Sequence, residues 1–340
     1  MRPLIFCRSC LILIGLSLNS RADELPVGSD ITSKHHIETQ FKQRVLATLT
    51  TTYTSPETVD GILTVYAPIP PNLPMQHLIS CDLRCRENPK IVPTTVTDIK
   101  NPLQRYLRLD IPITATTLQH PCAVDMIYVM DLYSAKLVPG PAPAGSVASV
   151  MPAAFSVFTH ESSRDDFNSQ AFQNFLNRNG LKRKPTESTM DFANRAYQFL
   201  HDKMHYVGHP YPGKASALCQ TLTGDCGVYA IMSASTLAAN GLPAATFPGR
   251  WAKDEEANYG QYHCFNGFFQ PGTGWITFDA LNQFGSVDGN FIAFSLTSDD
   301  CPQPGMTCPL WQFQMNSYHG NSPYNPKYED HWHVKAVSRP

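Results

Sequence analysis

The chain has 340 residues, of which 42% are hydrophobic, and a formal net charge of -2. A chain of this length can bury a substantial core and is long enough for two domains. The weak charge argues against a nucleic-acid-binding protein built on a basic surface. The 28 prolines and 20 glycines are spread without any repeat, which argues against a low-complexity chain.

The N-terminus has the features of a secretory signal peptide. Arg2 and Arg8 flank a short apolar stretch, residues 11–18 are apolar, and Ser20 and Ala22 supply the small residues of a cleavage site. We therefore expect cleavage near Ala22 and a mature protein that is secreted or periplasmic. The apolar run is too short to span a bilayer, so no stable membrane insertion is expected after cleavage; an uncleaved anchor is the alternative.

Between residues 40 and 138 the sequence predicts a β-rich region. Val, Ile, Thr, Leu and Tyr occur in short runs that Pro, Asn and Asp separate, at the spacing expected of a β-sandwich. In one run Leu107, Leu109 and Ile111 alternate with charged residues, so this strand should be buried on one face. The predicted strands are 44–53, 62–66, 94–99, 106–111 and 123–132.

A Pro/Ala/Gly-rich segment, 138–152, is the expected linker. The expected organisation is a signal peptide 1–22, a β-rich N-terminal domain 23–150 and a second domain 151–340. Beyond the linker, amphipathic helices are followed by strands, which is typical of an α+β domain whose helices pack on an antiparallel sheet. The predicted helices are 165–179, 188–204 and 223–240, and the predicted strands are 262–269, 274–280, 290–296 and 331–337.

Cys226 is the strongest candidate for a reactive side chain. Residues 228–239 are apolar or small and contain neither Gly nor Pro, which predicts a buried helix. Either Thr223 or Asp225 can cap the start of this helix. Cys226 is therefore expected in its first turn.

The first turn of a helix suits a nucleophilic cysteine. Its free N–H groups and the positive end of the helix dipole favour a thiolate over a thiol, and the same N–H groups can bind an oxyanion. Gly224 and Gly227 are small neighbours that should let a substrate approach the sulfur.

His263 and Asp279 are the expected partners of Cys226. A cysteine nucleophile needs a base that can also protonate the leaving group, and histidine suits both tasks near neutral pH. His263 lies on a predicted strand, Asp279 ends the next strand, and the tight turn 271–274 joins the two into a hairpin. Both residues lie about eight positions from the turn centre, so we expect them to meet roughly opposite each other.

Each of these residues also has a simpler interpretation. Cys226 could be a buried thiol or half of a disulfide, His263 a core histidine, and Asp279 a turn cap. The occurrence of all three residue types in this order favours the catalytic interpretation.

The remaining cysteines raise the question of disulfide bonds and zinc. Cys301 and Cys308 bracket a Pro/Gly turn and are the favoured disulfide pair, whereas Cys81 or Cys85 could reach Cys122 across neighbouring strands. No paired CxxC spacing is present, so no metal is expected, and no cofactor either.

The residues around Cys226 and His263 resemble the core of the transglutaminase-like superfamily. The resemblance rests on the run GDCGVYAIMSASTLAANGLPAATFPGRW and on YHCFNGFFQPGTGWITFDA, and it covers about 192–279. These runs contain a G-x-C that opens a helix, a G-[IL]-P-A element, an H-x-[WF] strand, and a G-x-G-W turn followed by Asp. The β-rich N-terminal half is similar to the β-domain that precedes this core in bacterial members. The expected fold is therefore α+β, with a papain-like transglutaminase core preceded by an N-terminal β-sandwich-like domain.

The resemblance implies acyl transfer through a thioester in the second domain. Cys226 would be the nucleophile, His263 the base and acid, and Asp279 the residue that orients the histidine. The oxyanion-hole side chain of the crosslinking members has no certain counterpart; Tyr206 is the first candidate and Gln220 the second. Trp251 is a further candidate for substrate contact, or else a core or cleft-lining residue.

We expect an exported cysteine hydrolase that cleaves peptide or glutamine-type amide bonds, because water is the default acceptor of a thioester. One alternative is amine transfer that crosslinks proteins, and another is a non-catalytic scaffold that binds partner proteins or a cell-surface polymer. The expected partner is a protein or peptide substrate, without nucleic acid. The sequence does not define an oligomeric state.

Overall fold

The computed structural model describes residues 34–54, 60–97, 101, 103–113, 122–141, 153–208, 213–253, 262–296, 315–320 and 327–339. The expected signal peptide, the domain boundary near residue 150 and the expected pair of Cys301 and Cys308 all lie outside these residues.

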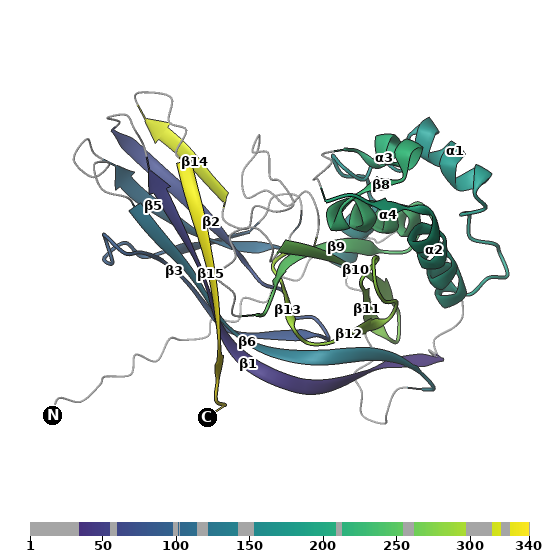
Figure 1. Ribbon diagram of the computed structural model, residues 1–340, viewed down its shortest axis with the longest axis horizontal. Coiled ribbons are helices and arrows are strands. Elements are labelled where there is room, and N and C mark those ends of the chain that lie inside the picture. The colour runs from purple at the N-terminus through teal and green to yellow at the C-terminus, as the bar shows by residue number, and fades with distance from the viewer. Residues whose placement is uncertain are drawn as a thin grey trace. The chain divides into compact units, whose positions relative to one another are not determined.

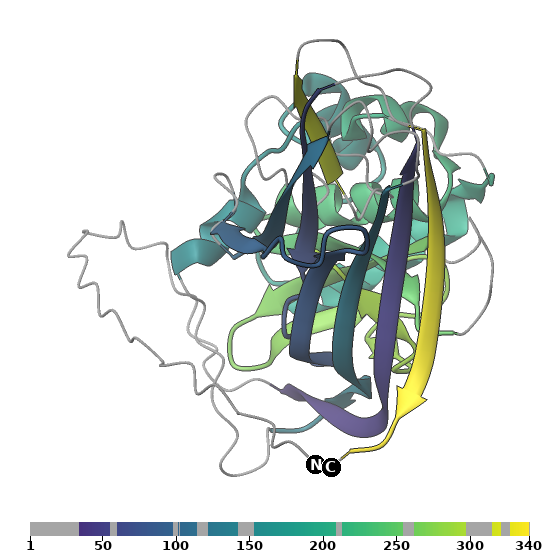
Figure 2. The same cartoon turned by 90° about the vertical axis from the view of Figure 1, so that its left-hand side faces the viewer.

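Two antiparallel sheets make up the β-rich part of the chain. Their strands are β1 His35–Thr54, β2 Gly61–Ile69, β3 Gln76–Cys85, β4 Thr94–Thr97, β5 Arg105–Ile113, β6 Cys122–Pro139, β12 Ser286–Val287, β14 Met315–Gly320 and β15 Lys327–Val337. The first sheet has the order β12-β6-β1-β15, with β3 on the other edge of β6, and the second has the order β14-β2-β5-β4. The long strand β1 lies between β6 and β15 along most of its length, as the purple and yellow strands of Figure 2 show.

Strands from both ends of the chain complete these sheets. β15 pairs with β1 from Arg44 opposite Val337 to Thr54 opposite Lys327, and β14 pairs with β2. The predicted strand at 331–337 is confirmed and extends back to Lys327. An N-terminal β-sandwich domain that precedes the core is therefore not confirmed, because the β structure also uses strands from beyond residue 280.

The helices and the remaining strands form the α+β part that the sequence predicts (Figure 1). The helices are η1 Ala153–Thr159, α1 Gln170–Arg178, α2 Thr189–Lys203, α3 Ala215–Thr221 and α4 Cys226–Ala238. β9 Ala244–Trp251, β10 Tyr262–Gln270, β11 Gly274–Phe278 and β13 Phe291–Ala293 form an antiparallel sheet of order β11-β10-β9-β13, and β7 His205–Tyr206 pairs in parallel with β8 Thr223–Gly224.

Helix α4 is buried on all sides and packs against the α+β sheet. Residues 227–238 are all buried, as expected of a helix whose residues are apolar or small all round. The amide of Asn266 on β10 donates a hydrogen bond to the carbonyl oxygen of Ala230 at 2.8 Å, which fixes the helix on the sheet. This contact positions the start of α4 near the neighbouring residues of β10.

Side chains of the β-rich sheets share a core with the α+β sheet. Val45 and Leu49 of β1 belong to the same hydrophobic cluster as Ile292 and Phe294. The side chain of Gln76 both donates to the carbonyl oxygen and accepts from the N–H of Ala293, at 2.8 Å each. The longest described helix, α2, has 15 residues, and no described helix combines the length and hydropathy that crossing a bilayer requires.

Candidate active site

Cys226 occupies the first position of α4, as the sequence predicts. Asp225 is the N-cap, and its carboxylate accepts a hydrogen bond from the N–H of Val228 at 3.1 Å. The preceding residues are held by the short pairing of β7 and β8, in which Val207 donates to the carbonyl oxygen of Gly224. The cap at Asp225 and the pairing of β7 with β8 thus fix the position of Cys226 at the start of α4.

Leu222 turns the chain into this loop with an unusual backbone conformation. Its φ of 50° is the one positive value at a non-glycine residue among the described residues, and it ends α3. A left-handed conformation costs an L-residue about 1–2 kcal/mol. The strain is therefore located four residues before Cys226, where a sharp turn is needed between α3 and α4.

Gly224 lies where the protein has no room for a side chain. A Cβ atom there would lie 2.4 Å from two side-chain atoms of Val228, which is well inside van der Waals contact. The structure therefore shows a packing role for Gly224, and its role in substrate access stays a prediction. Glycine is needed because the loop passes directly over the first turn of α4.

His263 and Asp279 meet, as expected, but diagonally. His263 Nε2 lies 2.9 Å from Asp279 Oδ2, and both side chains are buried. The register pairs Gln270 with Gly274 and Asn266 with Phe278, so continuing it places Asp279 opposite Phe265. The two catalytic candidates are therefore diagonal neighbours on one face of the hairpin, a distance that their side chains can bridge.

The Asp279 carboxylate accepts hydrogen bonds from three residues. Besides His263, the amide of Asn282 donates to Oδ2 at 2.7 Å, and the N–H of Leu281 donates to Oδ1 at 2.9 Å. Burial opposes the charge on Asp279, but the bond and charge of His263 and the other donors outweigh it, so the pKa of this carboxyl lies below its ordinary value. Asp279 is thus held as a carboxylate that accepts from the ring.

His263 is also coupled to Cys226. Asp279 engages Nε2 of the ring, which leaves Nδ1 as the ring nitrogen available to the cysteine. Burial would lower the pKa of His263, but its bonds to Asp279 and Cys226 raise it to about 9. The imidazolium form is therefore favoured across neutral pH.

Cys226 is correspondingly acidic. The thiol of Cys264 and then the His263 ring donate to its sulfur and outweigh burial, which lowers the pKa of Cys226 to about 5. Between these two values the favoured state is a thiolate paired with an imidazolium. Such a pair supplies a nucleophile and a proton donor together.

Cys264 is a buried thiol next to the pair. It follows His263 on β10 and points to the α4 side of the sheet, as Asn266 does. Its interaction with Cys226, followed by burial, raises the pKa of Cys264 well above its ordinary value, so it stays a thiol. Cys264 does not form a disulfide with Cys219, since both cysteines are free in the structure.

An aromatic wall surrounds His263. The indole of Trp251 stacks on the imidazole with ring centroids 5.0 Å apart and planes 23° apart. Phe265 and Phe291 meet the same ring edge-on, and they stack on each other at 4.3 Å. The wall restricts water around the ring and fixes its orientation.

The two candidates for an oxyanion-hole side chain lie in different surroundings. Tyr206 pairs with Gly224 across β7 and β8, is exposed, and is close enough to Cys226 for the thiolate charge to affect it. Burial, followed by that charge, raises the pKa of the Tyr206 phenol, which keeps it a hydrogen-bond donor. Gln220 is exposed on α3 and donates to the carbonyl oxygen of Ser216 in its own helix.

Three residues of the site were missed from the sequence as functional candidates. Asn282 donates to Asp279, Phe291 forms part of the aromatic wall, and Cys264 contacts the candidate nucleophile. For Asn282 a local signal exists, because an Asp followed three residues later by Asn after a strand is typical of a side-chain-capped turn. For Phe291 no local signal exists, since it reaches the site through the pairing of β13 with β9.

Comparison with known proteins supports the same family. A family model described as the transglutaminase-like superfamily matches residues 177–280, so the resemblance seen in the sequence motifs is confirmed for this segment. The crystal structure of a candidate cysteine protease from Cytophaga hutchinsonii is similar over 89% of this chain and 94% of its own, with a TM-score of 0.54 and 13% identity. At this identity, the likeness shows a shared fold.

The periplasmic domain of TgpA from Pseudomonas aeruginosa is a more distant neighbour. It is 14% identical over 73% of this chain and 87% of its own, with a TM-score of 0.38, which is too low to support a structural argument. No curated protein sequence is a match to this chain.

Proposed function

We propose that the protein is an exported cysteine hydrolase that cleaves peptide or glutamine-type amide bonds through a thioester on Cys226. One observation carries the proposal: His263 is bound to Asp279 at 2.9 Å and lies close enough to Cys226 for the two groups to shift each other's pKa. In this proposal the three residues act as a catalytic triad.

The first half-reaction follows from the ion pair. The thiolate of Cys226 attacks the carbonyl carbon, and the developing oxyanion is stabilised at the start of α4. The N–H of Cys226 is suited to this task because the first helical residues have no intrahelical acceptor, and the Tyr206 hydroxyl is the candidate side-chain donor. His263 then transfers its Nδ1 proton to the leaving nitrogen, the C–N bond breaks, and a thioester remains.

Hydrolysis of the thioester reverses the role of the histidine. Neutral His263 now takes a proton from water through Nδ1, while Asp279 holds Nε2–H and so fixes the tautomer. The resulting hydroxide attacks the thioester, the C–S bond breaks, and a carboxylic acid and the Cys226 thiolate are released. Trp251 borders this space and is the proposed substrate contact.

An acyl-adduct experiment tests the proposal. The chain is incubated with a pool of peptides that includes internal glutamines, quenched with acid, and measured by intact mass and by peptide mapping. We expect a thioester adduct on Cys226 and a carboxylic acid product. Cys226→Ala should lose both, whereas Cys219→Ala, which removes another thiol of the same part of the chain, should keep both.

The same experiment separates the alternatives. In the presence of a primary amine, a hydrolase gives mainly the acid, whereas a crosslinking transglutaminase gives mainly the substituted amide. A non-catalytic scaffold gives neither adduct nor product. An adduct of equal yield in the Cys226→Ala variant would refute the assignment of the nucleophile.

A further inference from the structure

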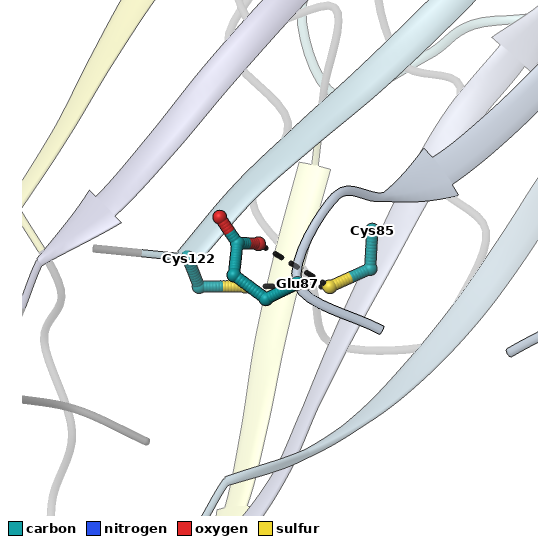
Figure 3. Close-up of side chains that lie close together, drawn as sticks. All are labelled: Cys85, Glu87 and Cys122. Carbon is teal, nitrogen blue, oxygen red and sulfur yellow. Dashed lines mark hydrogen bonds between the residues drawn. The ribbon is translucent and has the colours of Figure 1, made fainter. Parts of the chain in front are cut away.

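Three ligand-type side chains meet at the end of β3, away from the proposed active site. Cys85 Sγ lies 3.8 Å from Cys122 Sγ and 3.6 Å from Glu87 Oε2, and all three donor atoms lie within 4.8 Å of one another (Figure 3). Cys85 ends β3, Glu87 lies in the turn that follows, and Cys122 begins β6. The cluster therefore joins the ends of two paired strands.

These separations match the edges of a zinc coordination tetrahedron. Zinc binds thiolate sulfur at about 2.3 Å and carboxylate oxygen at about 2.0–2.2 Å, which in a tetrahedron separates two sulfurs by about 3.8 Å and sulfur from oxygen by about 3.6 Å. The two distances from Cys85 equal these values. A disulfide, by contrast, needs the sulfurs to be about 2.05 Å apart.

A backbone group outside the cluster holds one of the donors in place. The N–H of Ala123 donates to Glu87 Oε2 at 2.9 Å. Such an outer bond orients a metal ligand. It forms here because Glu87 lies just beyond the end of β3, next to the start of β6.

A bidentate ion pair anchors the same turn. Arg86 Nε and Nη2 lie 2.8 and 2.7 Å from the two carboxylate oxygens of Asp125 on β6. The guanidinium also donates to Thr50 on β1 at 3.0 Å, so the turn is tied to two strands of the sheet. The ion pair therefore fixes the residue between Cys85 and Glu87 on the sheet.

We propose that Cys85, Glu87 and Cys122 bind one zinc ion, or a divalent ion of similar softness, which clips β3 to β6. Two thiolates and a carboxylate supply three of four tetrahedral positions, and water takes the fourth. Binding releases the two thiol protons and forms two Zn–S bonds and one Zn–O bond. The proposal is independent of the proposed catalytic activity.

Zinc binding is best measured in a Cys226→Ala chain, because the proposed triad could itself bind the ion. The chain is purified with a reductant, dialysed against buffered zinc alone, and its metal content measured by elemental mass spectrometry. We expect one zinc per chain and a higher thermal midpoint in its presence. A further Cys122→Ser change should remove the zinc and the thermal shift, whereas Cys81→Ser, which changes a neighbouring cysteine of β3 outside the cluster, should retain both.

Glu87→Gln should weaken zinc binding by at least about tenfold, since losing even an outer partner of a metal ligand costs about that much. Cobalt substitution needs no further variant: a tetrahedral spectrum with sulfur-to-metal charge transfer supports the site even if a cysteine variant fails to fold. Zinc content no higher than in the Cys122→Ser chain, or the absence of a sulfur-ligated cobalt spectrum, would overturn the proposal. So would a peptide that links Cys85 and Cys122 by a disulfide in the chain as secreted, because a disulfide leaves neither thiolate for a metal.

Discussion

The change Asp279→Asn tests whether the buried carboxylate sets the chemistry of Cys226. Three donors point at the two oxygens of Asp279, from His263, Asn282 and Leu281. Asparagine has one oxygen and one NH2 group in place of the two oxygens of Asp279. The NH2 group, itself a donor, must therefore face at least one of these three donors. If the NH2 group faces Nε2, the ring places its proton on Nδ1 in the neutral state, and His263 cannot accept a proton from Cys226 or from water.

The magnitude follows from the pKa of the histidine. Its value of about 9 lies above the ordinary 6.5 because the interactions with Asp279 and Cys226 outweigh burial, and the net effect corresponds to about 3 kcal/mol. Without the carboxylate, only Cys226 opposes the effect of burial, so the pKa of His263 falls well below about 9 and fewer rings stay protonated at pH 7.5. The thiolate loses its counter-ion, and its reactivity at this pH should fall about ten- to thirtyfold.

The assay is the rate at which iodoacetamide alkylates Cys226, followed by peptide mass spectrometry across pH 4 to 10. In the unchanged chain the rate should rise through pH about 5, and turnover should follow a bell limited by the coupled values of about 5 and about 9. In Asp279→Asn the rise should move toward the ordinary pKa of a thiol, and turnover should fall by up to about 10⁴-fold because of the wrong tautomer. Asn282→Ala, which keeps the carboxylate, is the matched control, and an Asp279→Asn profile identical to that of the unchanged chain would refute the reasoning.

Three further changes probe the surroundings of the site and the β-rich sheets. Trp251→Ala removes the ring stacked on His263 and should lower kcat/KM about three- to tenfold, with Trp251→Phe close to the unchanged protein; equal losses in both would contradict a stacking role. Gly224→Ala places a Cβ atom 2.4 Å from the Val228 side chain and should lower the free energy of unfolding by about 1–3 kcal/mol in denaturant titrations. Adding Val228→Ala should recover part of that loss, and no recovery would argue against the clash. The pKa of Asp131 is lowered from 3.8 to about 2 by its arginine partners, so its contribution to stability is complete above pH 3.8 and is lost as the pH falls through about 2. Asp131→Asn should therefore lower the thermal midpoint at neutral pH and flatten its acid dependence, which calorimetry can check.

The position of Cys226 could be predicted because its signals are local. An Asp cap precedes a run of apolar residues, and the structure uses both as expected. The hairpin was also predictable from its turn, in which Thr273 donates to Gln270 at 3.0 Å and Gly272 has a φ of 81°. Asp279 is the partner of His263 that the sequence predicts, but its diagonal position was not predictable, because a shift of a residue or two in a tight turn changes which side chains are directly opposite.

Elements that depend on distant partners were harder to predict. Strand β9 was missed because Pro248 argues against a central strand. Pro248 is tolerated because its carbonyl oxygen still accepts a hydrogen bond from the N–H of Phe294 at 2.9 Å, just beyond the residues of β13 that pair with Gly249, Arg250 and Trp251. Strand β3 was missed because its exposure does not alternate along most of its length and a bulge interrupts it after Leu78.

The proposed zinc site at Cys85, Glu87 and Cys122 was also hard to predict because it depends on residues that are distant in the sequence. Sequence spacing argued against a metal because no paired CxxC is present. The structure brings Cys85 and Glu87 to Cys122 through the register of β3 and β6, in which Cys85 lies opposite Val124. The pairing of β3 with β6 therefore sets the distances among the three side chains. A local sequence motif carries no information about that pairing.

The last long strand connects the β-rich sheets to the proposed active site. Trp332 on β15 donates from its indole N–H to the carbonyl oxygen of Trp251 at 3.0 Å. The buried guanidinium of Arg250 lies 3.6 Å from Asp330 on the same strand and stacks over Tyr262, the residue before His263. Trp251, which stacks on the imidazole, and Tyr262, which precedes His263, are therefore both held by contacts with β15. Through these contacts the β-rich sheets support Trp251, the member of the aromatic wall that stacks on His263.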